Sequence, residues 1–163
     1  PAAGDPAARR RLRRGRATRR ADPGAPTAIA VGTLIDSSVL IAAERRKLDL
    51  DDALRAHAEE PVGIASITAS ELLHGVHRAA TTAQRQRRDA FVEQLLAVLP
   101  VFPFHLATAR IHASLWAGLV AKGASVGSHD LLIGATAIAL GYRVATRGRR
   151  SFGKIPGLEV VVL

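Results

Sequence analysis

The stretch TLIDSSVLI, from Thr33 to Ile41, has the composition of a short buried β-strand that runs into a helix. TLID is typical of the strand, and Ser37 and Ser38 are residue types that cap helices, which predicts a helix from there to about Arg46. Asp36 interrupts the apolar run where the strand ends. An isolated carboxylate in apolar surroundings is costly unless it is paired, protonated or bound to a cation. Asp36 is therefore the first candidate for a functional residue.

The composition predicts one globular domain preceded by a basic tail. The chain has 163 residues, of which 48% are hydrophobic, and this is enough for a single domain with its own core. Most of the net charge of +9 lies in residues 1–26, which hold eight arginines and two aspartates. Leu12 is the only large apolar side chain there, so we expect residues 1–31 to be disordered and residues 32–163 to form the domain. An RNA-binding arm, a transit peptide and a start site placed too far upstream are all interpretations of the tail that stay open.

Several classes of protein are excluded by residues that the sequence lacks. The chain contains no cysteine, which excludes a disulfide framework, a thiolate zinc site and a cysteine nucleophile, and which favours the cytoplasm. No apolar run reaches the roughly 18 residues that a membrane span needs, and no stretch has the basic-then-apolar-then-small order expected of a secretory signal. Neither a GxGxxG nor a GxxxxGK[ST] phosphate loop occurs. An aspartate-nucleophile phosphatase would need an acid at Ser38.

After residue 46, short apolar runs alternate with amphipathic segments. Helices are predicted at residues 49–60, 68–79, 82–99, 107–122 and 131–142, and strands at 62–67, 99–104, 143–146 and 158–163. Strands separated by helices need crossover connections, which predicts an α/β fold with a mostly parallel sheet covered by helices on both faces. Ligands of such sheets collect beyond the carboxyl ends of the strands, which is where Asp36 falls.

Two further acids have settings like that of Asp36. Glu71 lies in ASELLHGV, in the first turn of a predicted helix, and Asp130 lies in SHDLLIGATAIALG, at the start of another. Converging carboxylates make a hard-oxygen site that suits Mg²⁺ or Mn²⁺, and such an ion can promote attack of water on a phosphodiester. Structural interpretations also stay open. Glu71 could complete a capping box with Thr68, and Asp130 could simply favour the helix N-terminus next to Ser128.

Other residues that could carry chemistry give weaker signals. His74 and His77 lie three apart on a helix without a third ligand, so we expect them to be partly exposed helix residues. His129 adjoins Asp130 and could contact a substrate phosphate or lie on the surface. Trp116 belongs either to the core or to a dimer interface. A cluster of arginines follows the late strand and could bind phosphate or form a solvated turn: Arg147, Arg149 and Arg150.

In these residues the chain resembles a PIN-domain ribonuclease, and more closely a VapC-type toxin of bacterial toxin–antitoxin pairs. The resemblance covers residues 32–163 and is carried by four motifs in order: LIDSSVLI, ASELLHGV, SHDLLIGATAIALGYRVATR and SFGKIPGLEVV. It implies a three-layer α/β/α fold and endonucleolytic cleavage of RNA with Mg²⁺ or Mn²⁺. It also implies that Asp36, Glu71 and Asp130 bind the metal and carry catalysis, and that Ser38 supports Asp36 by a hydrogen bond.

This chain departs from the family pattern at one place, and the resemblance also implies binding partners. Family members often carry a further Asp or Asn just after TR of the late strand, or an Asp before the following Phe, but here Gly148 and Ser151 stand at these places. A second metal ion is therefore doubtful. The implied partners are an RNA substrate, a second copy of the chain, and an antitoxin whose C-terminal segment docks over the SELLHGV helix and the early helix. A PIN-like module that binds RNA or protein without catalysis is the alternative, and DNA cleavage by the same acids is a third interpretation.

Overall fold

The protein is described here by a computed structural model that covers residues 31–55 and 59–163. Its strands in this part of the chain form one parallel sheet in the order β3-β2-β1-β4-β5. They are β1 (Thr33–Ile35), β2 (Val62–Ala65), β3 (Val101–Phe102), β4 (Arg143–Thr146) and β5 (Val160–Val162). The predicted α/β fold with a parallel sheet is confirmed. The tail predicted at residues 1–31 lies outside the described residues, except for Val31.

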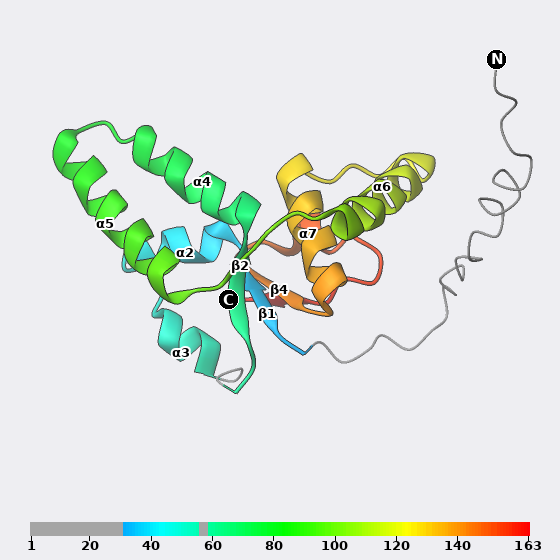
Figure 1. Cartoon of the computed structure of the whole chain (residues 1–163), viewed down its shortest axis with the longest axis horizontal. Coiled ribbons are helices and arrows are strands. Elements are labelled where there is room, and N and C mark those ends of the chain that lie inside the picture. Colours follow the sequence, from blue (N-terminus) through cyan, green and yellow to red (C-terminus); the bar gives the residue numbers. More distant parts are fainter. Residues whose placement is uncertain (1–30, 56–58) are drawn as a thin grey trace, which may run out of the picture.

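Helices cover both faces of the sheet (Figure 1). One side carries α2 (Ser37–Glu44), α3 (Leu50–Leu54), α4 (Ser66–His77) and α5 (Thr82–Val98), and the other carries α6 (Leu106–Ala121), α7 (Ser128–Leu140) and α8 (Arg149–Phe152). Successive strand residues point to opposite faces, so Leu34 packs with α6 and α7 whereas Ile35 packs with α2 and α4. Ala65 and Ile64 of β2 are divided between the same two cores. The three-layer arrangement is confirmed.

The predicted helix starts were wrong at two places that matter for the site. Helix α2 is capped by Asp36, whose side chain accepts a hydrogen bond from the Ser38 N–H, and not by a serine. Helix α4 begins at Ser66 with no side-chain cap, and Thr68 lies fully buried inside its first turn. Thr68 therefore cannot form a capping box with Glu71. In both cases the chain turns directly from strand to helix, so the helix starts earlier than the polar residue suggests.

Other boundaries shifted for local reasons. The helix expected over residues 49–60 ends at Leu54 as α3, and residues 56–58 of that prediction lie outside the described part. Helix α7 begins at Ser128, so Asp130 lies within its first turn. It ends at Leu140, and the residue that follows, Gly141, adopts a φ of 70°. The turn-rich segment after β4 contains α8, which the sequence analysis missed. Among the described residues no helix has both the length and the apolar character needed to cross a bilayer.

Candidate active site

Asp36 lies at the carboxyl end of β1, in the centre of the sheet between β2 and β4. Its backbone N–H donates to the carbonyl oxygen of Ala145 at 2.9 Å, which extends the pairing of β1 with β4 by one residue. Only 6% of the residue is exposed. The strand pairing therefore fixes the backbone of this acid, and the start of α2 turns its side chain beyond the sheet.

One carboxylate oxygen of Asp36 receives all of its hydrogen bonds. Oδ2 accepts from Ser38 Oγ at 2.6 Å, from Thr146 Oγ1 at 3.0 Å and from the Ser38 N–H at 3.3 Å. Within residues 31–55 and 59–163 nothing donates to Oδ1, and that atom is not sealed from solvent. Such a division leaves one oxygen anchored and one available to a ligand. The support of Asp36 by Ser38 is as the resemblance implied.

The two hydroxyl groups are themselves oriented by backbone amides. The Arg147 N–H donates to Ser38 Oγ at 3.1 Å, and the Gly148 N–H donates to Thr146 Oγ1 at 3.2 Å. Because each hydroxyl accepts an N–H, its single proton is free to point at Asp36. Thr146 was not among the predicted site residues. The available signal was a polar residue at the end of the strand that neighbours β1.

Asp130 projects from the first turn of α7. Burial is the largest effect on its carboxyl group and raises the pKa above the ordinary value, and the negative charges of Asp36 and Glu71 raise the pKa further. A hydrogen bond from the Ser151 hydroxyl and the neighbouring His129 oppose this rise in the pKa. Asp130 therefore lies within electrostatic reach of both Asp36 and Glu71, although the three acids come from distant parts of the chain.

Glu71 projects from α4 towards α7. Its Oε1 lies 2.8 Å from Nδ1 of His129, so the two helices are joined beside Asp130. The Glu71 carboxylate thus contacts His129 and does not form the capping box with Thr68 that was considered for it. His129, which we predicted to touch substrate or lie on the surface, is 59% exposed at its side chain and holds an acid.

The carboxylate oxygens of the three acids are suitable ligands for a hard divalent cation, but the three side chains do not converge on one coordination site. Within the described ranges no group of three or more His, Asp or Glu residues is close enough to hold a metal ion together. Carboxylate oxygens prefer Mg²⁺ or Mn²⁺, and one or two of them suffice for Mg²⁺, which keeps several waters. The open oxygen of Asp36 and the mutual repulsion at Asp130 are features that a cation would stabilise. The assignment of Asp36, Glu71 and Asp130 as ligands stays a prediction.

The remaining predicted residues are exposed and lie outside the group of acids. Arg147, Arg149 and Arg150 are exposed, and their side chains form no ion pair with any described carboxylate. Their role in binding phosphate stays a prediction. His74 and His77 are exposed on α4, as expected. Trp116 is 60% exposed on α6, which excludes the core position considered for it.

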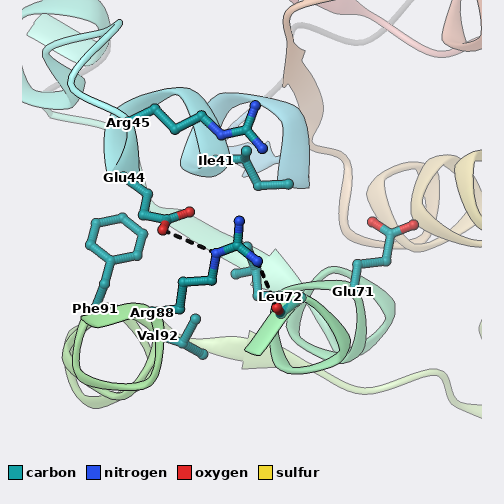
Figure 2. A pocket seen from close by; sticks show the side chains of 9 residues that line it. Ile41, Glu44, Arg45, Glu71, Leu72, Arg88, Phe91 and Val92 are labelled. Carbon is teal, nitrogen blue, oxygen red and sulfur yellow. Dashed lines mark hydrogen bonds and ion pairs between the residues drawn. The ribbon is translucent and has the colours of Figure 1, made fainter. Parts of the chain in front are cut away.

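A groove between α2, α4 and α5 leads away from Glu71 (Figure 2). Its inner part is a cavity of about 120 Å³ with Ile41, Leu72 and Val92 in its lining. Its outer part is a cavity of about 540 Å³, which we call the arginine basin and which shares Glu44, Arg45 and Phe91 with the inner part. The basin is lined by Ala43, Glu44, Arg45, Arg46, Arg87 and Phe91.

Fold and site together define a class of protein, and sequence comparison agrees with it. The profile of the PIN domain matches residues 33–158, and the chain belongs to the PIN-domain family. It is 33% identical over 133 residues to "Ribonuclease VapC1" of Rickettsia felis, which covers 82% of this chain and 97% of that protein. It is also 32% identical over 97 residues to "tRNA(fMet)-specific endonuclease VapC" of Salmonella typhimurium, covering 60% of this chain and 71% of the relative.

Solved structures show the same fold. The VapBC-5 toxin–antitoxin complex of Mycobacterium tuberculosis contains a chain with a TM-score of 0.66 and 31% identity, covering 82% of this chain and 99% of the other. VapBC2 of Rickettsia felis, bound to a promoter DNA fragment, contains a chain with a TM-score of 0.73 and 23% identity. The match covers 80% of this chain and 98% of the other. The family that the sequence motifs predicted is thus confirmed.

Proposed function

We propose that this protein is the toxin of a toxin–antitoxin pair and acts as a metal-dependent endoribonuclease in the cytoplasm. The observation that carries the proposal is the anchored carboxylate of Asp36 at the carboxyl end of a parallel sheet, within electrostatic reach of Asp130. The similarity to VapC ribonucleases along most of the chain supports the same activity. The cysteine-free sequence suits a reducing compartment.

The reaction is hydrolysis of an RNA phosphodiester, in which water attacks phosphorus and a ribose oxygen leaves. Ser38 and Thr146 hold the Asp36 carboxylate in place through Oδ2 and leave Oδ1 open, and Asp130 supplies the second carboxylate. His129 holds Glu71 at the rim, and Arg147 and Arg149 bind flanking phosphates. Asp36, Asp130 and Glu71 would hold Mg²⁺ or Mn²⁺. When bound, the ion supplies neutralisation of phosphate charge and activation of water.

Purified protein incubated with total RNA tests this proposal. Cleavage should require Mg²⁺ or Mn²⁺ and stop with EDTA, and Asp36→Ala and Asp130→Asn should each abolish it while circular dichroism stays unchanged. Asp89→Asn is the matched control, because Asp89 is exposed on α5 and lies outside this site. Undiminished cleavage by either site variant would show that the roles assigned to these acids are wrong.

The noncatalytic alternative is favoured by the absence of a ready three-ligand group among the described residues. Calorimetric titration with Mn²⁺ separates the two functions. A catalytic protein should bind Mn²⁺ and lose this binding in Asp36→Ala. A protein that binds no Mn²⁺ at millimolar concentration, but retains RNA affinity in the same variant, is a binding module.

We propose that the antitoxin docks in the groove between α2, α4 and α5. Apolar side chains line the inner part, and Arg45, Arg46 and Arg87 around the basin form no ion pair with a described carboxylate. Glu44 in the same basin is already paired with Arg88. Such a groove fits an antitoxin segment with apolar side chains followed by acidic ones. A segment seated there would lie against Glu71 and obstruct the site.

Co-expression with the antitoxin, sought as the product of a small open reading frame next to this gene, tests the docking site. Arg46→Glu combined with Arg87→Glu should weaken the complex and release ribonuclease activity. Arg110→Glu, on the exposed surface of α6 and outside the groove, should leave the complex intact. Equal affinity of all three proteins for the neighbouring gene product would exclude the groove as the docking site.

We also propose that the protein forms a homodimer through α6. Four large apolar side chains on this helix or just before it are exposed: Phe104, Leu106, Trp116 and Val120. Trp116 and Val120 line a cavity of about 380 Å³, together with His112 and Leu131. An apolar surface of this kind, next to a hollow, suits a second copy that presents the same face in return.

A further inference from the structure

We infer that Arg46 and Gly75 are specificity-determining residues of the groove between α2, α4 and α5, and that each stands where another residue would make the free protein more stable. The inference rests on the proposed docking of the antitoxin in this groove. It goes beyond that proposal by naming two residues whose substitution should stabilise the fold and at the same time weaken the binding of a partner.

Arg46 has a backbone conformation that favours glycine. Its φ is 54°, and no other described residue except glycine has a positive φ. At the end of α2, the Arg46 N–H donates to the carbonyl oxygen of Ala43 at 2.9 Å. The next N–H, that of Lys47, donates to the carbonyl oxygen of Ala42 at 2.9 Å. These two bonds form a Schellman motif, whose left-handed residue is usually glycine, because a Cβ atom makes that conformation unfavourable.

Two other helices of this chain end with the same pair of hydrogen bonds. After α6 the left-handed residue is Gly123, with a φ of 62°, and after α7 it is Gly141, with a φ of 70°. Arginine takes this place only at the end of α2, where the residue lines the arginine basin. Arg46 is exposed there and forms no ion pair with any described carboxylate. A strained residue whose side chain has no ionic partner in the free protein indicates a contact that is made in a complex.

Gly75 is the opposite case, a glycine where another residue would be more stable. It lies in α4, and glycine in a helix is less stable than alanine because it loses more backbone freedom on folding. A Cβ atom built on Gly75 would meet no atom of the surrounding described residues within 4 Å, so the glycine does not avoid a clash within the chain. Gly75 lines the inner part of the groove together with Leu72 and Phe91. It leaves space there for an apolar side chain of a partner.

The two residues set the order of chemistry along the partner segment. Gly75 lines the inner, apolar part of the groove, whereas Arg46 lines the outer basin. The acid in the lining of the basin, Glu44, is already paired with Arg88 at 3.3 Å, so it does not neutralise Arg46. A segment seated in the groove would place an apolar side chain over Gly75 and a carboxylate against Arg46, whose guanidinium group can donate two parallel hydrogen bonds to it.

Fluorescence anisotropy with the full chain in EDTA tests the role of Arg46. The probes are two labelled peptides in which leucine and phenylalanine are followed either by glutamates or by lysines, and the parent should prefer the glutamate peptide by roughly tenfold or more. Arg46→Gly should raise the melting temperature by a few degrees, because it relieves the strain, and should weaken the glutamate peptide by roughly tenfold. Arg87→Gln removes a charge from the same basin without relieving strain. It should weaken this peptide and leave the melting temperature unchanged.

The same measurements test Gly75. Gly75→Ala should raise the melting temperature, but it should weaken both peptides by the same factor of roughly ten, because the added methyl group takes the space of an apolar side chain. Gly118→Ala is the matched control, since Gly118 lies in α6 and a Cβ atom there also meets nothing within 4 Å. It should raise the melting temperature and leave both affinities unchanged. Gly123→Arg should lower the melting temperature by about as much as Arg46→Gly raises it.

Several results would overturn the inference. They are an unchanged or lower melting temperature in Arg46→Gly, and parent-like affinity for the glutamate peptide in Arg46→Gly or Gly75→Ala. A roughly tenfold loss of oligouridylate affinity in Arg46→Gly would also overturn it, because the basin would then belong to the RNA site. A parent that cleaves RNA but binds neither peptide would overturn the inference and leave the proposed ribonuclease activity intact. A parent that binds the glutamate peptide as described but cleaves no RNA would contradict that activity alone.

Discussion

At the scale of single residues, the site depends on hydroxyl groups as much as on acids. Asp36 is nearly buried, and an ionised carboxylate in that position needs donors to offset its lost hydration. Ser38 and Thr146 supply them, and backbone amides of the segment after β4 orient both hydroxyls. The charge at the centre of the sheet edge is therefore held by residues from two neighbouring strand ends.

Thr146→Val tests this dependence. The substitution preserves shape but removes the donor to Asp36 and the acceptor of the Gly148 N–H. We expect a loss of about 1–2 kcal/mol in the free energy of unfolding and a fall of about 10- to 100-fold in RNA cleavage. Thr136→Val is the control, because Thr136 is also buried but its hydroxyl only donates to the carbonyl of Leu132. Equal cleavage by both variants would show that the hydroxyl of Thr146 is dispensable.

Asp130 gives the metal-free protein a pH dependence of known sign. Burial and two neighbouring acids raise its folded-state pKa, so the folded protein binds the proton more tightly than the unfolded chain does. Ionisation of Asp130 therefore destabilises the folded state. This destabilisation is absent below the unfolded pKa of about 3.9, and it grows until the pH has passed the folded pKa. In EDTA, the melting temperature of Asp130→Asn relative to the parent should therefore increase from about pH 3 to pH 7. Asp89→Asn should show no such increase, and a constant difference for Asp130→Asn would contradict the argument.

At the scale of elements, one arginine joins the helices that form the groove. Arg88 of α5 donates through Nη1 to the carbonyl oxygen of Gly75 at 2.9 Å, in the last turn of α4, where carbonyls lack helical partners. Its Nε contacts Glu44 of α2 at 3.3 Å (Figure 2). Because both charged side chains are mostly buried, this contact is less screened than a surface ion pair.

Arg88→Met should loosen this three-helix contact. The variant keeps the apolar stem but leaves the Gly75 carbonyl and the Glu44 carboxylate without their donor. We expect the free energy of unfolding in urea to fall by about 1–3 kcal/mol. Arg85→Met, at an exposed position of the same helix, should change it by less than about 0.5 kcal/mol. Similar losses in the two variants would mean that the contact contributes little.

The type and order of the elements could be predicted because the apolar pattern of each segment agrees with its place in the fold. The strand of Thr33–Ile35 and the apolar helix that ends at Gly141 are examples. Helix starts were less predictable, since Asp36 caps a helix with the same side chain that serves the site, and Thr68 is buried by tertiary packing. The bond between Glu71 and His129 could not be predicted, because it depends on how α4 and α7 approach each other across 58 residues of chain.

At the scale of the whole molecule, the face of α6 is the feature that a single chain does not explain. Trp116 is 60% exposed, and its ring lies 6.0 Å from that of His112, which in turn lies 5.9 Å from the ring of Phe104. A row of rings over an open hollow exposes apolar surface that a folded chain normally covers. In a twofold dimer the same face would meet itself, so Trp116 of each copy could enter the hollow of the other.

Substitution of Trp116 should therefore weaken the dimer. Trp116→Ala removes a large buried ring from the proposed interface, and a central tryptophan of this kind contributes about 2 kcal/mol or more, which predicts a dimer dissociation constant raised by at least roughly thirtyfold. Val98→Glu changes a residue that is 74% exposed on α5, away from α6, and should leave the constant unchanged. Sedimentation equilibrium over a range of concentrations measures both variants against the parent. Since Asp36, Glu71 and Asp130 all lie within one chain, the monomeric variant should retain its affinity for Mn²⁺, and a parent that is monomeric at every concentration would remove α6 as the dimer interface.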